Sequence, residues 1–544
     1  MVRAMGFEAW CILLSVLLLL FYLYCTNTFG YWKQRGIHYL EPTIIFGNIK
    51  DRMMLRVSFH DFQKELYQSF EGHKYGGIYE GRRPTLLLRD PELIKTVMVR
   101  DFDSFVDRPM LRERSSPYID NMLLYIKGQH WKNVRSLLTP TFSSGKLKEM
   151  KNLIDQCGQQ LNTYLRTQTG KTDSQVELEM KELFGRFTLD LIASCAFGVQ
   201  CDSLKDPEAE FVRIASTYND ISLLQRILIY FVFLFVPQYA HFFPVKTFNP
   251  KCVDFLANVV KETKQYRRVH KEQKWNDLLQ LMLDAAEEEQ EEGMSKNEDS
   301  STKTSTRKTS TVLNEETIIA QSLMFLLAGF ETSSTLLTFA SYELALNQDI
   351  QQKLRTEVEE VLGRYEGQCT YEALHEMSYL EMVLLGDVTA RYDTLQEMSY
   401  LEMVLLETLR KHPPLARVDR SVTQPYTIPG TNIQLDEGVC VSIPVMGLHH
   451  DPRYYPQPDV FDPDRFLPAQ KAARSPYVYQ AFGNGPRNCI GTRFALMSTK
   501  IAMVQVIKDF YLKPSPKTEV PYTISRFSML LKSENGIWLN VEKI

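Results

Sequence analysis

The ten residues FGNGPRNCIG, Phe482 to Gly491, place a cysteine in a loop that could hold a metal. Its three glycines permit backbone angles closed to other residues, and Pro486 fixes a turn. Such a loop can aim backbone N–H groups at the sulfur of Cys489, with Arg487 near enough to hold an anion. The apolar run 494–497 predicts that the loop opens a helix, whose N-terminus stabilises a thiolate. This chemistry suits an iron ligand; for the cysteine alone, a buried structural thiol is the alternative.

A second polar group, Gly329, Glu331 and Thr332, interrupts an apolar stretch that predicts a long helix over residues 314–346. A glycine, an acid and a threonine are unfavourable inside such a helix. Gly329 removes bulk, so a flat cofactor could approach the backbone there. Glu331 and Thr332 could relay protons into a dry pocket. The alternative is a kink in which the Thr332 hydroxyl bonds back to a carbonyl.

Two further pairs have helical spacing. Glu407 and Arg410 stand at i and i+3 and can form an ion pair, although most such pairs are solvated. Trp131 and Arg135 stand at i and i+4, so both would face one way and could donate hydrogen bonds to an anion. A plain surface helix is the alternative for that second pair.

The composition narrows the class of protein. The 544 residues are 44% hydrophobic and 24% charged, with a net charge of −4 that gives no reason to expect nucleic acid. The nine cysteines are scattered and include no C-x-x-C, which argues against a zinc ribbon and a disulfide framework. Reduced thiols fit a domain that faces the cytosol. The adjacent His449 and His450 could suggest a metal site, but neighbouring residues on a strand face opposite ways.

The N-terminus predicts a membrane anchor over residues 1–29, followed by a catalytic domain over 30–544. Residues 9–25 are almost unbroken apolar and uncharged, near the lower length limit for a membrane helix. Lys33 and Arg35 follow that run, so the positive-inside rule leaves the bulk of the protein in the cytosol. A cleaved signal peptide is the alternative, but no clear small-residue cleavage site is present.

Three other segments stand out in a chain that otherwise predicts helices and a small sheet built from its early and late parts. Residues 227–236 are apolar but too short to span a bilayer, which favours a dip into the membrane surface over a core helix. Residues 285–313 are charged and rich in Ser and Thr, which predicts a disordered surface loop. The sequence EMSYLEMVLL occurs at 376–385 and again at 397–406, which indicates a local tandem duplication or an error in gene assembly.

The cysteine loop resembles the heme-binding signature of the cytochrome P-450 family. Its fixed positions are matched by Phe482, Gly485, Arg487, Cys489 and Gly491. The sequence of the chain as a whole looks most like those of the insect microsomal members that oxidise xenobiotics and endogenous lipophiles. The resemblance implies that the oxygen-activation motif consists of Ala328, Gly329, Glu331 and Thr332. It further implies that the heme propionates are bound by Trp131, Arg135, Arg420 and Arg487, and that the cysteine loop is supported by Glu407, Arg410 and Arg465.

For the whole molecule, the resemblance implies a mainly α fold, a triangular prism with a small β subdomain, behind a single N-terminal anchor. It implies heme b with Cys489 as the axial iron ligand, and treats His449 and His450 as structural. The function expected is a monooxygenase in the endoplasmic reticulum membrane, its catalytic domain on the cytosolic side. Its partners would be NADPH–cytochrome P-450 reductase, cytochrome b5 and a lipophilic substrate. The alternatives are a heme-thiolate isomerase or dehydratase, and a non-catalytic heme-binding protein impaired by the duplication.

Overall fold

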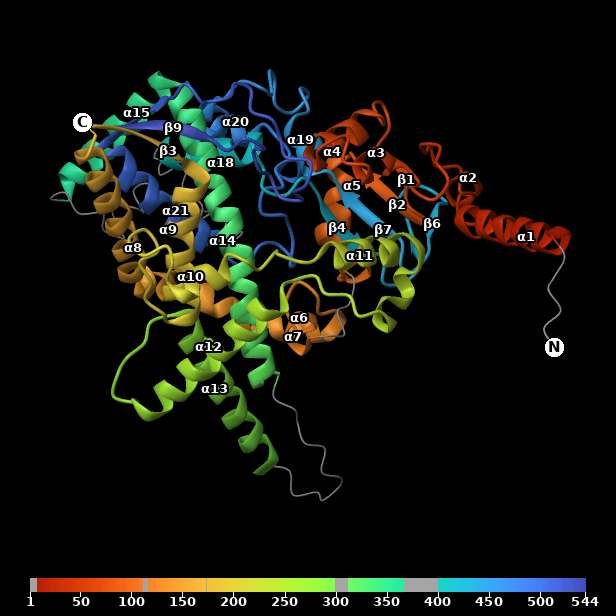
Figure 1. Cartoon of the computed structure of the whole chain (residues 1–544), viewed down its shortest axis with the longest axis horizontal. Helices are drawn as coiled ribbons and strands as arrows, with labels where there is room; N and C mark the ends of the chain where they lie inside the picture. The colour runs from red at the N-terminus through yellow and green to blue at the C-terminus, as the bar shows by residue number, and fades with distance from the viewer. Residues whose placement is uncertain (1–6, 111–115, 173, 299–311, 366–399) are drawn as a thin grey trace.

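A long apolar helix, α14 (Glu315–Leu346), runs through the helical part of the molecule (Figure 1). The Asn314 side chain caps it by accepting a hydrogen bond of 2.8 Å from the Thr317 N–H. The helix occupies the stretch predicted from the apolar run. By length and composition it could cross a membrane, but most of it is buried. Between its ends, its most accessible part is the turn 327–332, where a site could form.

The computed structural model describes residues 7–110, 116–172, 174–298, 312–365 and 400–544. The first copy of the repeat, 376–385, and the first residues of the second copy, 397–399, lie outside the described part. The N-terminal and β-rich region contains the helices α1 (Phe7–Thr26), α2 (Tyr31–Gln34), α3 (Lys50–Met53), α4 (Phe59–Gln68), α5 (Pro91–Lys95), α11 (Leu223–Phe235) and α19 (Val445–His449).

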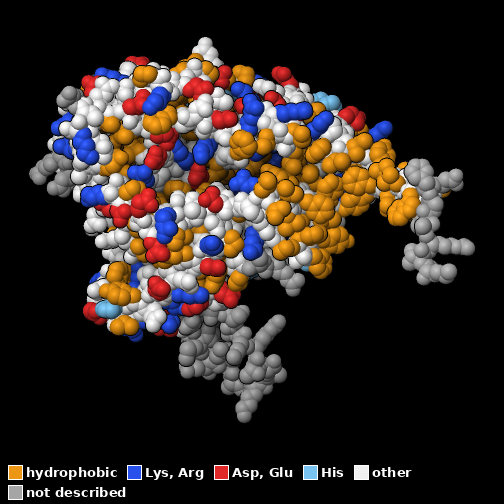
Figure 2. Space-filling view, in the orientation of Figure 1, with side chains coloured by type: hydrophobic (Ala, Val, Ile, Leu, Met, Phe, Trp, Pro, Cys, Tyr) orange, Lys and Arg blue, Asp and Glu red, His pale blue; other side chains and the backbone are white. Residues whose placement is uncertain are grey.

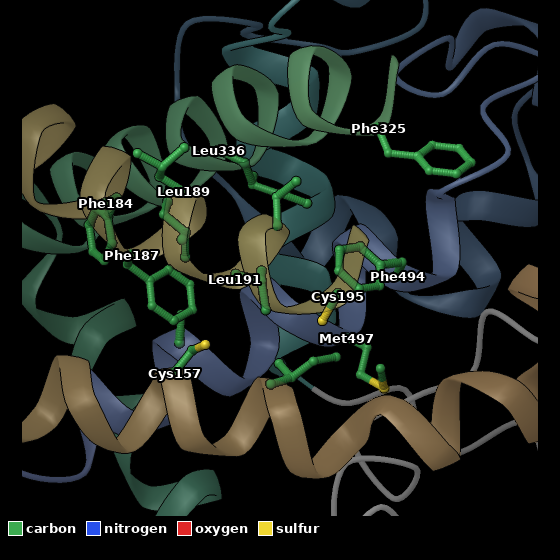
Figure 3. Packing of buried hydrophobic residues seen from close by; sticks show 14 of the residues in the cluster. Cys157, Phe184, Phe187, Leu189, Leu191, Cys195, Phe325, Leu336, Phe494 and Met497 are labelled. Carbon is green, nitrogen blue, oxygen red and sulfur yellow. The ribbon is translucent and has the colours of Figure 1, made fainter. Parts of the chain in front are cut away.

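The helical part contains α6 (Pro117–Asp120), α7 (Gly128–Leu138), α8 (Ser144–Gly170), α9 (Met180–Ile192), α10 (Glu210–Ala215), α12 (Pro250–Val269), α13 (Leu278–Glu298), α15 (Gln348–Arg364), α18 (Tyr400–Lys411), α20 (Pro468–Ala472) and α21 (Thr492–Ile507). Helix α9 packs against both α8 and α14. Figure 3 shows this core, in which Phe187 of α9 lies over Cys157 of α8 and Phe494 projects from α21. The core therefore fixes α21, and the loop that precedes it, against α14.

The main sheet joins distant parts of the chain, as predicted. Its strand order is β1-β2-β7-β4, with β1 (Tyr75–Glu80), β2 (Arg83–Leu88), β7 (Cys440–Ile443) and β4 (Val418–Ser421). The pairing of β2 with β7 is parallel and the other two are antiparallel. The sequence did not predict a second antiparallel sheet of β3 (Gln175–Glu179), β9 (Trp538–Lys543) and β8 (Phe510–Pro514). Strands β5 (Tyr426–Thr427) and β6 (Gln434–Leu435) form an antiparallel hairpin.

The prediction of a disordered loop over 285–313 is wrong for residues 285–298. Helix α13 continues to Glu298. Its acidic stretch is rich in Glu, Gln and Ala, which have high helix propensity, and the buried Leu279, Met282 and Ala286 attach it to the core. The Glu289 carboxylate then accepts hydrogen bonds from the N–H groups of Val312 and Leu313. Residues 299–311 lie outside the described part.

Helix α1 projects from the body with an apolar, almost fully exposed surface, and its residues Ala9–Thr26 are long and apolar enough to cross a membrane (Figure 1). The apolar run predicted to dip into the membrane forms α11, in which Leu223 and Leu224 are 71% and 79% exposed. Val232 and Leu234 are its buried residues. Figure 2 shows apolar side chains gathered over α11 and continuing toward α1.

Candidate active site

The cysteine loop, Phe482 to Gly491, is closed on itself by backbone hydrogen bonds. The Cys489 N–H donates to the Phe482 carbonyl at 2.9 Å, and the Asn488 N–H donates to the Gly485 carbonyl at 3.0 Å. Gly485 has a φ of +74°, and a Cβ there would lie 1.9 Å from the Met98 carbonyl oxygen. Gly483 also uses an angle that glycine permits, with a φ of +69°, whereas Gly491 has an ordinary φ of −90°. Helix α21 begins at the next residue, as predicted.

The sulfur of Cys489 is placed among hydrogen-bond donors. Burial raises the pKa of the Cys489 thiol, whereas the Gly491 N–H and the Thr492 side chain lower it, as do the positive charges of Arg135 and Arg108. The surroundings are thus dense enough to desolvate the thiol, yet its side chain is exposed. We infer that the sulfur lies on an internal surface that a ligand can reach.

An arginine cluster, made of Arg108, Arg135, Arg420 and Arg487, lies close to the cysteine loop. Arg420 is fully buried, and its Nη1 donates to the Asp419 carbonyl at 3.0 Å. Among the described residues, its Nε and Nη2 and the Nε of Arg108 have no hydrogen-bond partner. Burial, then the charges of Arg108 and Arg487, hold the pKa of Arg420 well below its usual range. Buried cationic donors without acceptors are costly, so this cluster fits an anionic group.

Arg108 was missed by the sequence analysis. It donates to the Arg487 carbonyl at 3.5 Å, and burial lowers its pKa. Its segment has no helical spacing or repeated pattern that would mark it, so only the folded structure brings it to the cluster. Burial, followed by the charge of Arg108, lowers the pKa of Arg487 to about 9.

Helix α7 brings Trp131 and Arg135 to the cysteine loop. The Arg487 guanidinium lies 4.7 Å from the Trp131 ring centroid, a cation–π contact. Arg135 does not point its donors at an open position: Nη1 donates to the Asn488 carbonyl at 3.1 Å and Nη2 to the Asn488 Oδ1 at 2.8 Å. Arg487 likewise donates to backbone carbonyls, including that of Ile126 at 3.0 Å. Both arginines therefore brace the walls of the site.

Gly329 lies in the accessible turn of α14, where α9 packs against it. A Cβ at Gly329 would lie 2.7 Å from Cδ1 of Ile192, so the missing side chain lets α9 approach this turn closely. Ala328, one residue earlier, is exposed. The Thr332 hydroxyl donates to the Ala328 carbonyl at 2.6 Å, which is the back-bonded arrangement considered as the alternative.

Glu331 is held from two sides. Its Oε1 lies 3.1 Å from Nζ of Lys181 at the start of α9, and its Oε2 accepts from the Tyr218 hydroxyl at 3.2 Å. Lys181 also donates to the hydroxyls of Ser334 and Thr335, at 2.7 and 2.8 Å. The acid therefore has a fixed position on α14, next to the exposed turn.

Helix α18 carries a buried ion pair. Nε and Nη2 of Arg410 each lie 2.7 Å from a carboxylate oxygen of Glu407, and neither side chain is exposed. The Asp462 N–H donates to Glu407 at 3.1 Å, and Nε of Arg465 lies 3.5 Å from the same carboxylate. Arg410 also donates to the Pro458 carbonyl at 2.8 Å. The pair thus ties α18 to the segment 457–465.

His449 connects that pair to the cysteine loop. It lies in α19, so the expectation that the adjacent histidines occupy a strand is wrong. Its Nε2 accepts from the Gln480 N–H at 2.8 Å, which leaves Nδ1 to donate to the Arg410 carbonyl at 3.1 Å. Burial, then the charge of Arg410, lowers the pKa of His449 to about 3, so it is neutral. In the described residues no three His, Cys, Asp or Glu side chains converge on a metal site.

Comparisons with known proteins agree with this site. A family model described as Cytochrome P450 matches residues 38–385 and 383–540, two segments that overlap at the last three residues of the first copy of the repeat. The chain is 34% identical to Cytochrome P450 9e2 of Blattella germanica over 98% of both chains. It is 36% identical to Probable cytochrome P450 6a13 of Drosophila melanogaster, covering 96% of this chain and 97% of the relative. The chain therefore belongs to the cytochrome P450 family of heme-thiolate monooxygenases.

Proposed function

We propose that this enzyme inserts one oxygen atom of O2 into a lipophilic substrate, using electrons from NADPH–cytochrome P-450 reductase. The observation that carries the proposal is the cysteine loop beside buried arginine donors that lack an anion. Cytochrome b5 is the second electron donor that we propose. Lipophilic substrates are supported by the partly buried apolar residues near the site, among them Met110, Leu124 and Phe330.

The residues present fit heme b. Cys489 would bind the iron through its sulfur, whose pKa the Gly491 N–H lowers, and Arg420 and Arg108 would bind the propionates with their unpartnered donors. Once bound, a heme ligated by thiolate supplies the chemistry of dioxygen activation. Phe482 and Gly485 would set the shape of the loop, which fits against Met98 at Gly485.

The remaining residues of the site would position the heme and the cysteine loop or deliver protons. Trp131, Arg135 and Arg487 would hold the walls of the propionate region. Ala328 leaves space at the exposed turn of α14. The Thr332 hydroxyl donates its hydrogen to the Ala328 carbonyl, so its oxygen would be free to accept a hydrogen bond from a proton donor. Glu331, fixed by Lys181, would be the nearby acid. The pair Glu407–Arg410, with Arg465, would support the cysteine loop through His449.

We place the enzyme in the endoplasmic reticulum membrane, with residues 1–29 as the anchor and the catalytic domain on the cytosolic side. Support comes from the exposed apolar surface of α1 and from the basic Lys33 and Arg35 that follow it. The exposed apolar side chains of α11 support a second contact with the membrane surface.

The test of the proposed function is the optical spectrum of the reduced, carbon-monoxide-bound protein. In Cys489→Ala the thiolate-type spectrum should be lost, whereas Cys201→Ala, a half-buried cysteine outside the loop, should keep it. With reductase and NADPH, the wild-type protein should consume O2 and form product, and Cys489→Ala should not. A thiolate spectrum in Cys489→Ala would exclude the assignment. A normal spectrum with peroxide rearrangement, and no NADPH-dependent O2 consumption, would instead favour the isomerase or dehydratase.

A further inference from the structure

Arg82 occupies an unusual position on the turn between β1 and β2. Its guanidinium lies 3.6 Å from the centroid of the Tyr24 ring, and its Nη2 donates to the Asn27 Oδ1 at 2.9 Å. The Arg82 carbonyl accepts from the Thr28 hydroxyl at 2.7 Å. One residue of the catalytic domain thus holds the last turn of the anchor helix and the short link that follows it.

The same guanidinium reaches the other apolar element. Nη1 of Arg82 donates to the carbonyl of Phe235, the last residue of α11, at 3.4 Å. The Tyr24 hydroxyl of α1 donates to that carbonyl too, and the rings of Phe21 and Phe235 lie 6.0 Å apart. A helix C-terminus has carbonyls without partners inside the helix and favours a nearby positive charge. Arg82 supplies that charge from between the two helices.

This arrangement does not depend on an ion pair. Within the described residues, no carboxylate lies within salt-bridge distance of Arg82, and its Nε is buried without a partner. A cation beside two apolar helices is expensive unless its contacts fix a geometry or its head reaches the polar zone of a membrane. The neighbouring Arg83 differs, because it pairs with Glu80 at 2.7 Å.

We propose that Arg82 is a clamp that joins α1 to α11, so that the anchor and α11 meet the membrane as one unit and set the tilt of the catalytic domain. The proposal rests on the membrane location proposed above. Figure 2 shows the continuous apolar surface that such a unit would present to lipid. Without the clamp, the Tyr24 hydroxyl and the Phe21 ring would still contact Phe235, but α1 and α11 would be joined less tightly.

Cross-linking in vesicles tests the clamp. The full-length, heme-loaded protein, with the exposed Cys11 changed to serine, would carry the Phe21→Cys and Phe235→Cys substitutions. It would be placed in phosphatidylcholine–phosphatidylserine vesicles and treated with a short thiol cross-linker, and the joined peptides would be identified by mass spectrometry. We expect rapid joining in this parent and about tenfold slower joining in Arg82→Ala, since one cation–π contact and the polar contacts of Arg82 together correspond to such a factor.

Arg82→Lys keeps the charge but lacks the planar guanidinium group, so it should also slow the cross-linking reaction. This variant replaces Arg82→Ala in the test if Arg82→Ala fails to fold. Arg35→Ala is the matched control: Arg35 lies 3.7 Å over the ring of Tyr31 near the anchor, but it pairs with Asp436 away from α11. It should not change the rate. Unchanged joining in both Arg82 variants, or no joining in the parent, would overturn the clamp. Vesicle flotation and monooxygenase activity, measured separately, show whether the membrane location or the proposed function fails instead.

Discussion

The Thr332 hydroxyl donates a hydrogen bond of 2.6 Å to the Ala328 carbonyl, on the accessible middle turn of the mostly buried α14. A purely structural threonine would behave in the same way. Thr338, on the same helix, donates to the Ser334 carbonyl at 2.7 Å but is buried. The two residues therefore separate the structural effect of the back-bond from any effect of the accessible position.

We expect Thr332→Ala to keep heme and substrate binding but to divert oxygen to hydrogen peroxide. Loss of a group that takes part in proton transfer typically costs about 100-fold in rate, so product formed per NADPH consumed should fall strongly. Thr332→Ser should restore much of the coupling, and Thr338→Ala should leave it unchanged. The measurement is NADPH consumed, product formed and peroxide released in the same reaction. Equal coupling in Thr332→Ala and the wild-type protein would contradict a proton role.

At the scale of single residues, the sequence predicted those residues whose role depends on their own neighbours in the chain. The cysteine loop is an example, because Gly485 and Cys489 are fixed by local turns and backbone hydrogen bonds. It did not predict roles that depend on distant contacts. The side chain that fills the space at Gly329 is Ile192, and Arg108 reaches the site only through the folded chain.

At the scale of elements, α18 and the cysteine loop are joined by a buried polar network. The two-pronged pair of Glu407 and Arg410 holds the segment before the loop, and His449 carries the connection on to Gln480. The two buried charges partner each other, which is the condition under which a buried charge is tolerated. Removing Arg410 would leave the Glu407 carboxylate buried without its closest cation.

We expect Arg410→Ala to destabilise the fold by about 3–5 kcal/mol and to abolish heme loading, because the Glu407 carboxylate would remain buried without its cation. Arg410→Lys should lose most of the same stability, since a lysine cannot form both 2.7 Å contacts. The control is Arg56→Ala, which breaks a pair with Asp51 whose side chains are 62% and 63% exposed and should cost about 0–1 kcal/mol. Chemical unfolding and heme content measure both effects. A stable, heme-loaded Arg410→Ala would show that the pair is dispensable.

Elements were predictable where local pattern and long-range packing agree. The apolar run of α14 and the helix α21 that follows the cysteine loop are such cases. The acidic part of α13 was not, because its composition suits both a solvated loop and a helix, and the choice depends on the buried Leu279 and Met282. The sheet of β3, β8 and β9 pairs strands far apart in the chain, which periodicity within one strand cannot indicate.

At the scale of the whole molecule, the repeat gives the chain two segments for one place in the core. In the second copy, the N–H groups of Tyr400 and Leu401 donate to the Glu357 carboxylate at 2.6 and 2.9 Å, and Leu401 and Val404 are buried. The first copy has the same ten residues but lies outside the described part of the chain. The two segments of the family match also meet at the end of this copy, at 383–385.

Only the second copy can complete the site, because the residues 21 positions before Glu407 and Arg410 are Gly386 and Thr389, which cannot form the ion pair. Two identical segments that compete for one groove frustrate folding. We expect deletion of residues 376–396 to raise the yield of heme-loaded protein, by up to about twofold if the copies compete equally, and to leave the carbon monoxide spectrum unchanged. The deletion rejoins the chain as YEALHEMSYLEMVLLETLR, with no residue of α18 lost.

Matched substitutions in the two copies distinguish competition from a simple change of length. Leu380→Ser with Val383→Ser weakens the first copy alone and should also raise the yield. Leu401→Ser with Val404→Ser places the same changes in the buried copy and should abolish heme loading, since polar groups would be buried without partners. Heme content and thermal unfolding of the three variants give the answer. If the deletion and the first-copy variant both fold worse than the wild-type chain, the extra segment is part of the native fold, because competition alone would make its removal favourable.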